Sequence, residues 1–252
     1  MNRFFIPSDW IDQDKVVIMG KQVHQLKDVL RLRAGDHIAV LDNTGCEYGV
    51  EIARILRESV TGVICDKRYI EEPNTRITLY QALLKGNNFE LVLQKCTEIG
   101  VSSFVPVLCE RCVARNPDDK KQERWRKIIA EAAEQSGRGK LPTLKPVLDF
   151  RQACQTATNL SLLAWEGEAA SDLRPLLQSE AASTTRHPVN LFVGPEGGFS
   201  PAEVEFAQRC GIIPITLGKR VLRAETAGLV AATAILYEYG DLSHPSPVDK
   251  DS

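Results

Sequence analysis

Hydrophobic residues change their spacing along the chain near residue 72. Before this point they occur in short alternating or β-branched runs, such as 15–19 (KVVIM) and 48–56 (YGVEIARIL), with turn residues between them. Such runs are typical of β-strands. One helix is expected over 21–31, because Val23, Leu26 and Leu30 fall on one helical face. The pattern predicts a small β-barrel over residues 1–72, and the sequence EEPN reads as a linker.

After the linker, strand-like runs alternate with helical patterns. Strands are expected over 77–84, 103–109, 160–165, 190–193 and 212–217. Helices are expected from Asn87 or Asn88 to Gly100, from Asp118 to Gly137, and over 149–157, 171–178, 201–209 and 225–239. This alternation predicts an α/β domain over residues 75–242, with a parallel sheet and helices on both faces. Residues 243–252 (SHPSPVDKDS) are polar, hold two prolines and are expected to be a disordered tail.

A glycine-rich corner, residues 194–198 (GPEGG), joins the strand expected at 190–193 to the next helix. Ser200 and Glu203 form the spacing of a capping box, and Pro201 suits the first helical position. Glycines at such a corner let the backbone approach a ligand closely. The corner matches neither the dinucleotide fingerprint, nor the P-loop, nor the nucleophile elbow. A tight turn without a ligand is the alternative.

The loop at 217–223 (LGKRVLR) mixes cations with apolar side chains, a combination that suits a pocket around a flat apolar group such as a nucleoside. A third strand end carries 164–166 (AWE). All three segments follow predicted parallel strands, and open α/β sheets bind ligands at that edge. The alternative is a surface loop before an ordinary buried helix, since small residues line the segment 224–234.

Composition and charge argue against several classes of protein and of binding site. The net charge is -2, so no global charge indicates a nucleic-acid or membrane partner. No run approaches the ~20 apolar residues of a membrane span, and the N-terminus lacks the apolar core of a signal peptide, which predicts a cytoplasmic protein. Cys109 and Cys112 form a C-x-x-C pair without the second pair that a zinc site needs, so reduced thiols and no metal are expected.

Positive charge is concentrated locally. Residues 111–145 hold ten Lys or Arg and five Asp or Glu, which favours either a phosphate-binding surface or a solvated helix face. Candidate phosphate contacts, each of which could instead be a surface ion pair, are Arg3, Arg31, Arg33, Lys85, Arg111, Arg115 and Arg138.

Several motifs together resemble one known family. They are GPEGG with the following S-x-x-E, LGKRVLRAETA (217–227), KGNNFELVLQKCTEIGV (85–101), ERCVAR (110–115) and RWRKIIAEAAEQSGR (124–138). In this order they resemble the RsmE family of bacterial 16S ribosomal RNA uridine N3-methyltransferases. The resemblance covers nearly the whole chain, including RFFIP (3–7) and VLRLRAGD (29–36).

The resemblance implies a SPOUT methyltransferase domain with a trefoil knot, a PUA-like RNA-binding barrel and a homodimer. It also implies S-adenosylmethionine as cofactor, 16S rRNA of the small ribosomal subunit as partner, and N3 of one uridine (uridine 1498 in the family) as the methyl acceptor, in ribosome maturation. The implied cofactor residues are Ala164, Trp165, Glu166, Gly194, Pro195, Gly197, Gly198, Leu217, Gly218, Val221, Leu222, Ala224, Thr226 and Ala227.

Methyl transfer to uridine N3 requires stabilisation of a negatively charged base. Arg223 is the first candidate, because its permanent cation suits a uracil carbonyl oxygen. Glu196 and Glu225 are candidate general bases, although Glu225 suits equally well a role at the N-terminal dipole of the last helix. The sequence leaves the identity of any general base open, and it leaves open whether free rRNA or an assembled subunit is the substrate.

Two other functions stay open at this point. One is a noncatalytic RNA-binding protein whose α/β part only dimerises, although a dimer surface gives no reason for a cationic loop with apolar residues. The other is a nicotinamide-dependent oxidoreductase, and the missing dinucleotide fingerprint argues against it.

Overall fold

The computed structural model describes residues 1–114, 116–167, 170–181 and 188–243, and it divides into two units. Unit 1 comprises residues 1–72 together with 130–141, and unit 2 comprises 73–129 together with the chain from Pro142 onward. The sequence pattern predicted the break near 72 but did not assign 130–141 to the first unit. Of the tail expected at 243–252, all but Ser243 lies outside the described residues.

Unit 1 is built on a six-stranded sheet in the order β1-β4-β5-β6-β3-β2. All neighbours are antiparallel except β1 and β4. Two register shifts between β5 and β6 bend the sheet, and this curled sheet fits the predicted barrel. Its strands are β1 (Arg3–Phe5), β2 (Ile11–Asp12), β3 (Lys15–Met19), β4 (His37–Leu41), β5 (Cys46–Ile55) and β6 (Ser59–Tyr69).

Alternation along these strands produces the core of unit 1. In β3, Val16 and Ile18 are buried while Lys15, Val17 and Met19 face outward. The helix expected over 21–31 begins as α1 (Lys21–His24) and continues as a π-helix (η2, Gln25–Val29); a short 3₁₀ helix (η1, Ser8–Trp10) comes earlier.

The last turns of α3 (Asp119–Ser136) and the residues after them complete unit 1. Ala133 packs with Phe5 and Leu41, and the Glu134 Oε1 atom accepts a 2.9 Å hydrogen bond from the backbone N–H of Phe5. Burial is the main reason why the pKa of Glu134 is raised above its usual value.

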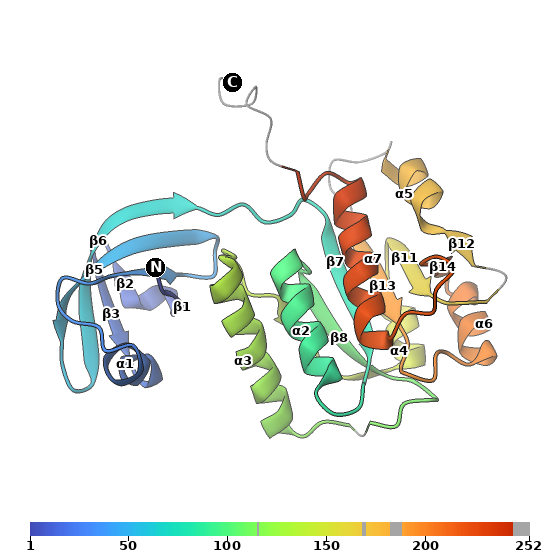
Figure 1. Cartoon of the computed structure of the whole chain (residues 1–252), viewed down its shortest axis with the longest axis horizontal. Helices are drawn as coiled ribbons and strands as arrows, with labels where there is room; N and C mark the ends of the chain where they lie inside the picture. Colours follow the sequence, from blue (N-terminus) through green and yellow to red (C-terminus); the bar gives the residue numbers. More distant parts are fainter. Residues whose placement is uncertain (115, 168–169, 182–187, 244–252) are drawn as a thin grey trace. The chain divides into compact units, whose positions relative to one another are not determined.

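Unit 2 contains a parallel sheet in the order β10-β8-β7-β13-β11-β14-β12, with β9 also paired to β8 (Figure 1). All of its pairings are parallel, as the alternation of strands and helices predicted. The strands are β7 (Arg76–Ala82), β8 (Ser103–Leu108), β9 (Thr143–Leu144), β10 (Leu148–Asp149), β11 (Leu160–Ala164), β12 (Ser171–Asp172), β13 (Pro188–Val193) and β14 (Ile213–Thr216). The helices, besides α3, are α2 (Asn88–Ile99), α4 (Phe150–Thr156), α5 (Leu173–Ala181), α6 (Pro201–Arg209) and α7 (Ala224–Glu238).

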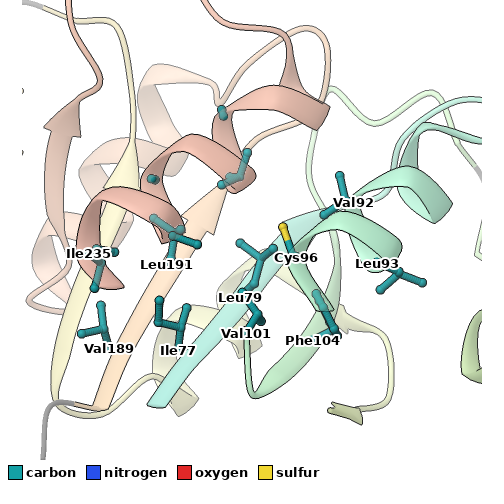
Figure 2. Close-up of a cluster of buried hydrophobic side chains, with 14 of the residues drawn as sticks. Ile77, Leu79, Val92, Leu93, Cys96, Val101, Phe104, Val189, Leu191 and Ile235 are labelled. Carbon is teal, nitrogen blue, oxygen red and sulfur yellow. The ribbon is translucent and has the colours of Figure 1, made fainter. Parts of the chain in front are cut away.

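Helices cover both faces of this sheet. Leu79 of β7 points toward α2 and α7, and Ile235 of α7 closes the same cluster over Val189 and Leu191 of β13 (Figure 2). The next residue of β7, Tyr80, faces the opposite side and stacks on Phe192 in the cluster under α4 and α6. Strands buried on both faces explain why their sequences are nearly continuous hydrophobic runs.

One expected element differs from the structure. The segment 171–178 was predicted as helix, but Ser171 and Asp172 pair with β14 and the helix begins only at Leu173. In the described part of the chain, no helix is both long and apolar enough to cross a membrane.

Candidate active site

Three adjacent strands end at one cavity. β13, β11 and β14 are neighbours in the sheet, so the loops that follow them meet at its carboxyl edge. The cavity has a volume of about 680 Å³. Its lining consists of Asn88, Arg111, Ala164, Trp165, Glu166, Val193, Gly194, Pro195, Glu196, Gly197, Gly198, Phe199, Thr216, Leu217, Gly218, Arg220, Val221, Leu222, Arg223, Ala224, Glu225 and Ala227.

Each of the three glycines in the corner after β13 is explained by a different structural feature. A Cβ at Gly194 would lie 3.2 Å from the Phe199 ring, so a side chain there requires that ring to shift. A Cβ at Gly197 would lie 3.3 Å from the Cβ of Arg111, so glycine at this position leaves room for the Arg111 side chain to pack against the backbone of the corner. Gly198 has a φ of +66°, which residues with a side chain rarely adopt. The corner is therefore a fixed surface of backbone that borders the cavity.

A hydrogen-bonded network holds this corner to the turn after β8. The carboxylate of Glu203 is buried; it accepts 2.8 Å bonds from the backbone N–H groups of Glu110 and Ser200. The Ser200 hydroxyl donates to Glu110 Oε2 at 2.6 Å, and Arg111 Nη1 donates to the Gly197 carbonyl at 2.9 Å. The predicted capping box of Ser200 and Glu203 is present and also belongs to this network.

Glu196 has a structural contact of its own. Its Oε1 atom accepts a 2.9 Å hydrogen bond from the backbone N–H of Lys85, which lies in the loop between β7 and α2. One carboxylate oxygen is thus committed to joining two loops of the site.

Arg223 and Glu225 stand at the start of α7. The Arg223 side chain is 86 % exposed, with its Nη1 atom 3.9 Å from Glu225 Oε1, and both residues line the cavity. The Glu225 side chain is 13 % exposed and belongs to the first turn of the helix, where negative charge is favourable. The cavity therefore has an exposed, permanent cation at its edge, next to a shielded carboxylate.

Known proteins with similar sequences indicate which family this cavity belongs to. The family model for the RNA methyltransferase domain matches residues 71–236. The ribosomal RNA small subunit methyltransferase E of Synechocystis is 36% identical over 92% of this chain and 76% of its own length. The Bacillus subtilis protein of the same name is 32% identical over 88% of this chain and 89% of its own length. The chain belongs to the family of ribosomal RNA small subunit methyltransferase E.

Solved structures agree with this assignment. A ribosomal RNA small subunit methyltransferase E from Neisseria gonorrhoeae, bound to S-adenosyl methionine, superposes with a TM-score of 0.83 at 30% identity, covering 94% of this chain and 97% of that one. A putative methyltransferase from Legionella pneumophila, in complex with the same cofactor, gives a TM-score of 0.84 at 29% identity, covering 93% and 96%. The α/β fold predicted for this methyltransferase, with a parallel sheet and helices on both faces, is thus confirmed.

The structure brings most of the predicted cofactor and catalytic residues into one cavity. Thr226 is the exception, because it does not line the cavity. Lining residues that sequence reasoning did not select as cofactor or catalytic residues are Asn88, Val193, Phe199, Thr216 and Arg220, together with Arg111, which was predicted as a phosphate contact. Asn88 and Arg220 had appeared only as a helix cap and as a loop charge, and adjacency to the glycine corner was the signal that could have selected Phe199.

The residues predicted to contact phosphates differ in exposure and in their ion-pair partners. Arg31, Arg33 and Lys85 are exposed, while Arg111 lines the cavity. Arg115 lies outside the described residues. The two that the structure argues against are Arg3 and Arg138.

Arg138 is 7 % exposed and its Nη2 atom lies 2.5 Å from Glu72 Oε2, so its charge is neutralised inside unit 1. The Nε atom of Arg3 lies 2.7 Å from Glu47 Oε2. Glu47 is buried and also pairs with Arg68 through its other carboxylate oxygen, so Arg3 belongs to a cluster of three charged side chains around a buried carboxylate.

None of the seven cysteines forms a disulfide in the structure, and all seven lie among the described residues. Among the described residues, one group has the composition of a metal site: His37, Glu51 and Cys65, exposed on unit 1 with ligand atoms within 4.8 Å of one another. It does not belong to the cavity lining.

Proposed function

We propose that this protein transfers a methyl group from S-adenosylmethionine to small-subunit ribosomal RNA, at N3 of a uridine. The observation that carries the proposal is the cavity at three adjacent strand ends, in a chain of the ribosomal RNA small subunit methyltransferase E family. The Neisseria and Legionella relatives, similar over nearly their whole length, hold this cofactor.

The cavity residues fit an adenosyl group. A volume of about 680 Å³ falls in the range of small-molecule sites. Gly198 and Gly218 border the cavity, and an added Cβ at either would meet no atom within 4 Å, so space beside the backbone is open for a ligand. Leu217 and Leu222 are half-buried and offer apolar faces to a flat ring. The loops 164–166, 194–198 and 217–227 would hold the cofactor, which supplies an electrophilic methyl group when bound.

Arg223 would act on the acceptor base. The N3–H of uridine is weakly acidic, so the transfer needs the deprotonated base to be stabilised. The Arg223 guanidinium is permanently charged and lies at the cavity edge, where it could contact a uracil carbonyl on which negative charge develops. Glu225 is close enough to Arg223 to orient the guanidinium. We therefore infer that Glu225 positions Arg223, in preference to acting as a general base. For Glu196, the bond from Lys85 favours a structural role over proton transfer.

Two further features implied by the resemblance remain proposals. One is the trefoil knot formed by the C-terminal segments. The other is that the chain acts as a homodimer, and the apolar outer side of α7 supports it: Val230 and Tyr237 are exposed there.

The test compares Arg223→Ala with Lys219→Ala. Lys219 is exposed in the same loop but does not line the cavity, so it is the matched control for loss of a loop charge. We expect Arg223→Ala to keep cofactor affinity within a few fold in calorimetry and to lower the turnover of radiolabelled methyl transfer by about 10²–10³. Lys219→Ala should keep nearly wild-type turnover.

Each part of the proposal can be contradicted by a different result. Wild-type turnover in Arg223→Ala would remove this residue from the mechanism. A wild-type protein that gives no heat with millimolar S-adenosylmethionine would favour an RNA-binding protein without this activity. Mass spectrometry of nucleosides from the treated rRNA would identify the methylated position, and any product other than N3-methyluridine would contradict the assigned acceptor.

A further inference from the structure

The turn that follows β8 carries two cysteines in contact. The backbone N–H of Cys112 donates to the Cys109 carbonyl at 3.0 Å, which closes a β-turn over residues 109–112. The first and last Cα atoms of a β-turn are less than about 7 Å apart, and most disulfides span about 4.4–6.8 Å between Cα atoms. The backbone N–H of Cys109 also donates to the Cys112 sulfur at 3.3 Å, so this sulfur lies back over Cys109.

The two thiols differ in pKa and in burial. The thiol of Cys109 hydrogen-bonds to Cys112, and this is the main reason why the pKa of Cys112 is lowered to about 7 while that of Cys109 is raised. Cys112 is half-buried and reachable, whereas Cys109 is buried. A reactive thiolate next to a protonated partner is the arrangement in which the first sulfur is oxidised and the second resolves the product.

The residues between the two cysteines hold the active-site corner. Glu110 gives its backbone N–H to Glu203 and accepts from the Ser200 hydroxyl, while Arg111 binds the Gly197 carbonyl. Both contacts depend on the conformation of the 109–112 turn. A covalent bond across this turn would therefore alter the position of the corner that borders the cavity.

We propose that Cys109 and Cys112 are an oxidation site, which a hydroperoxide converts to a disulfide, and that the disulfide weakens cofactor binding through Glu110 and Arg111. The second half of this proposal rests on the proposed function of the cavity. The first half does not depend on it.

The chemistry balances with a hydroperoxide as the oxidant. The Cys112 thiolate attacks one peroxide oxygen; the O–O bond breaks, and the departing oxygen takes a proton, leaving as water from hydrogen peroxide and giving the sulfenic acid. The Cys109 sulfur then attacks the Cys112 sulfur. The S–S bond forms, the S–O bond breaks, and the hydroxide leaves as water with the Cys109 proton. Two thiols are oxidised and one peroxide is reduced.

The disulfide is tested by peptide mapping of the full chain after treatment with hydrogen peroxide. Trypsin cuts after Arg111, between the two cysteines, so the disulfide would link the peptide 96–111 to the peptide 112–115. Fragment ions separate a link through Cys109 from one through Cys96, which lies on the same peptide. We expect the linked pair in wild-type protein and in Cys65→Ser, the control that removes an exposed cysteine elsewhere. A Cys112 that ends as sulfinic acid, or that pairs with another cysteine, would overturn the proposal.

The effect on the site is tested by calorimetry with S-adenosylmethionine. We expect the peroxide-treated protein to bind about tenfold more weakly than the reduced protein, equivalent to about 1.4 kcal/mol, and a dithiol reductant to restore the affinity. Cys112→Ser is compared with itself before and after peroxide and should show no change. Equal affinities of the oxidised and reduced wild type, with the disulfide mapped, would refute the coupling. Absence of binding by the reduced wild type would instead contradict the proposed function and leave the mapping result valid.

Discussion

Single residues in this protein acquire their roles from neighbours that are distant in sequence. Arg138 was predicted as a phosphate contact, yet it is buried against Glu72, 66 positions away. No local pattern could have predicted this pairing, because it depends on the fold of unit 1. Glu196, by contrast, was selected from its place in the glycine corner, and the structure does place it at the cavity.

Cys112 gives a prediction at this scale. Its pKa is lowered to about 7, so its thiolate fraction should rise through neutral pH, below the range of an ordinary cysteine. We expect the rate of Cys112 alkylation by iodoacetamide to be half-maximal near pH 7, measured by mass spectrometry of the peptide 112–115. In Cys109→Ala the thiol partner is missing, and the midpoint should move upward. A midpoint above about pH 8.5, the ordinary value for cysteine, in the wild type would disagree with the contact between the two thiols.

At the scale of elements, the sequence pattern predicted the features that depend on neighbouring residues in the chain, such as helix starts and hydrophobic strands. The helices begin where caps were recognised, as at Ser200, and the strands of unit 2 follow the hydrophobic runs. Short strands such as β12 escaped prediction, because two residues form a strand only when a partner such as β14 is present. The change from α1 to a π-helix was likewise not predicted, because a segment of 5 residues is too short to show a different apolar period.

Two capping boxes in the described part of unit 2 allow a matched comparison. Ser200 caps α6 and also donates to Glu110, whereas Asp149 caps α4 outside the cavity lining. We expect Ser200→Ala and Asp149→Ala each to lower the free energy of unfolding by about 1 kcal/mol, with a larger loss for Ser200, as measured by urea titration. Only Ser200→Ala should weaken cofactor binding, by several fold. Equal cofactor affinities in the two variants would mean that the bond to Glu110 does not position the corner.

For the whole molecule, the cavity and a group of exposed cations belong to different units. Arg31 and Arg33 are part of unit 1, and the cavity is part of unit 2. The presence of two units was predictable, because the hydrophobic spacing changes between them. Which cations are available to bind RNA was not predictable from the sequence, since charge alone does not distinguish exposed cations from paired ones such as Arg3.

RNA affinity tests the assignment of Arg31 and Arg33. The double variant with alanine at both positions should bind small-subunit rRNA more weakly and reduce the slope of log affinity against log salt by about 0.7 for each phosphate that is no longer neutralised. Cofactor affinity should not change. Arg57→Ala is the control, because this exposed arginine of unit 1 is not among the assigned phosphate-binding residues. An unchanged salt slope in the double variant would place the RNA surface elsewhere.

The proposed homodimer has its own test. Tyr237 is 72 % exposed on the apolar outer side of α7, so Tyr237→Asp should disfavour association with a second copy. We expect sedimentation velocity to give a dimer for the wild type and a mainly monomeric species for this variant. Lys219→Asp serves as the charge control. A monomeric wild type at micromolar concentration would contradict the proposal.

The assignment of residues 130–141 to unit 1 has a consequence for biosynthesis. A nascent chain that has exposed only its first 72 residues lacks Ala133, Glu134 and Arg138, and with them part of the hydrophobic cluster and the partner of Glu72. Domains generally fold as units as they emerge from the ribosome, starting from the N-terminus. Here the N-terminal unit should stay incomplete until the chain has lengthened by about another seventy residues, so the first segment to be made cannot reach its final structure as soon as it is exposed.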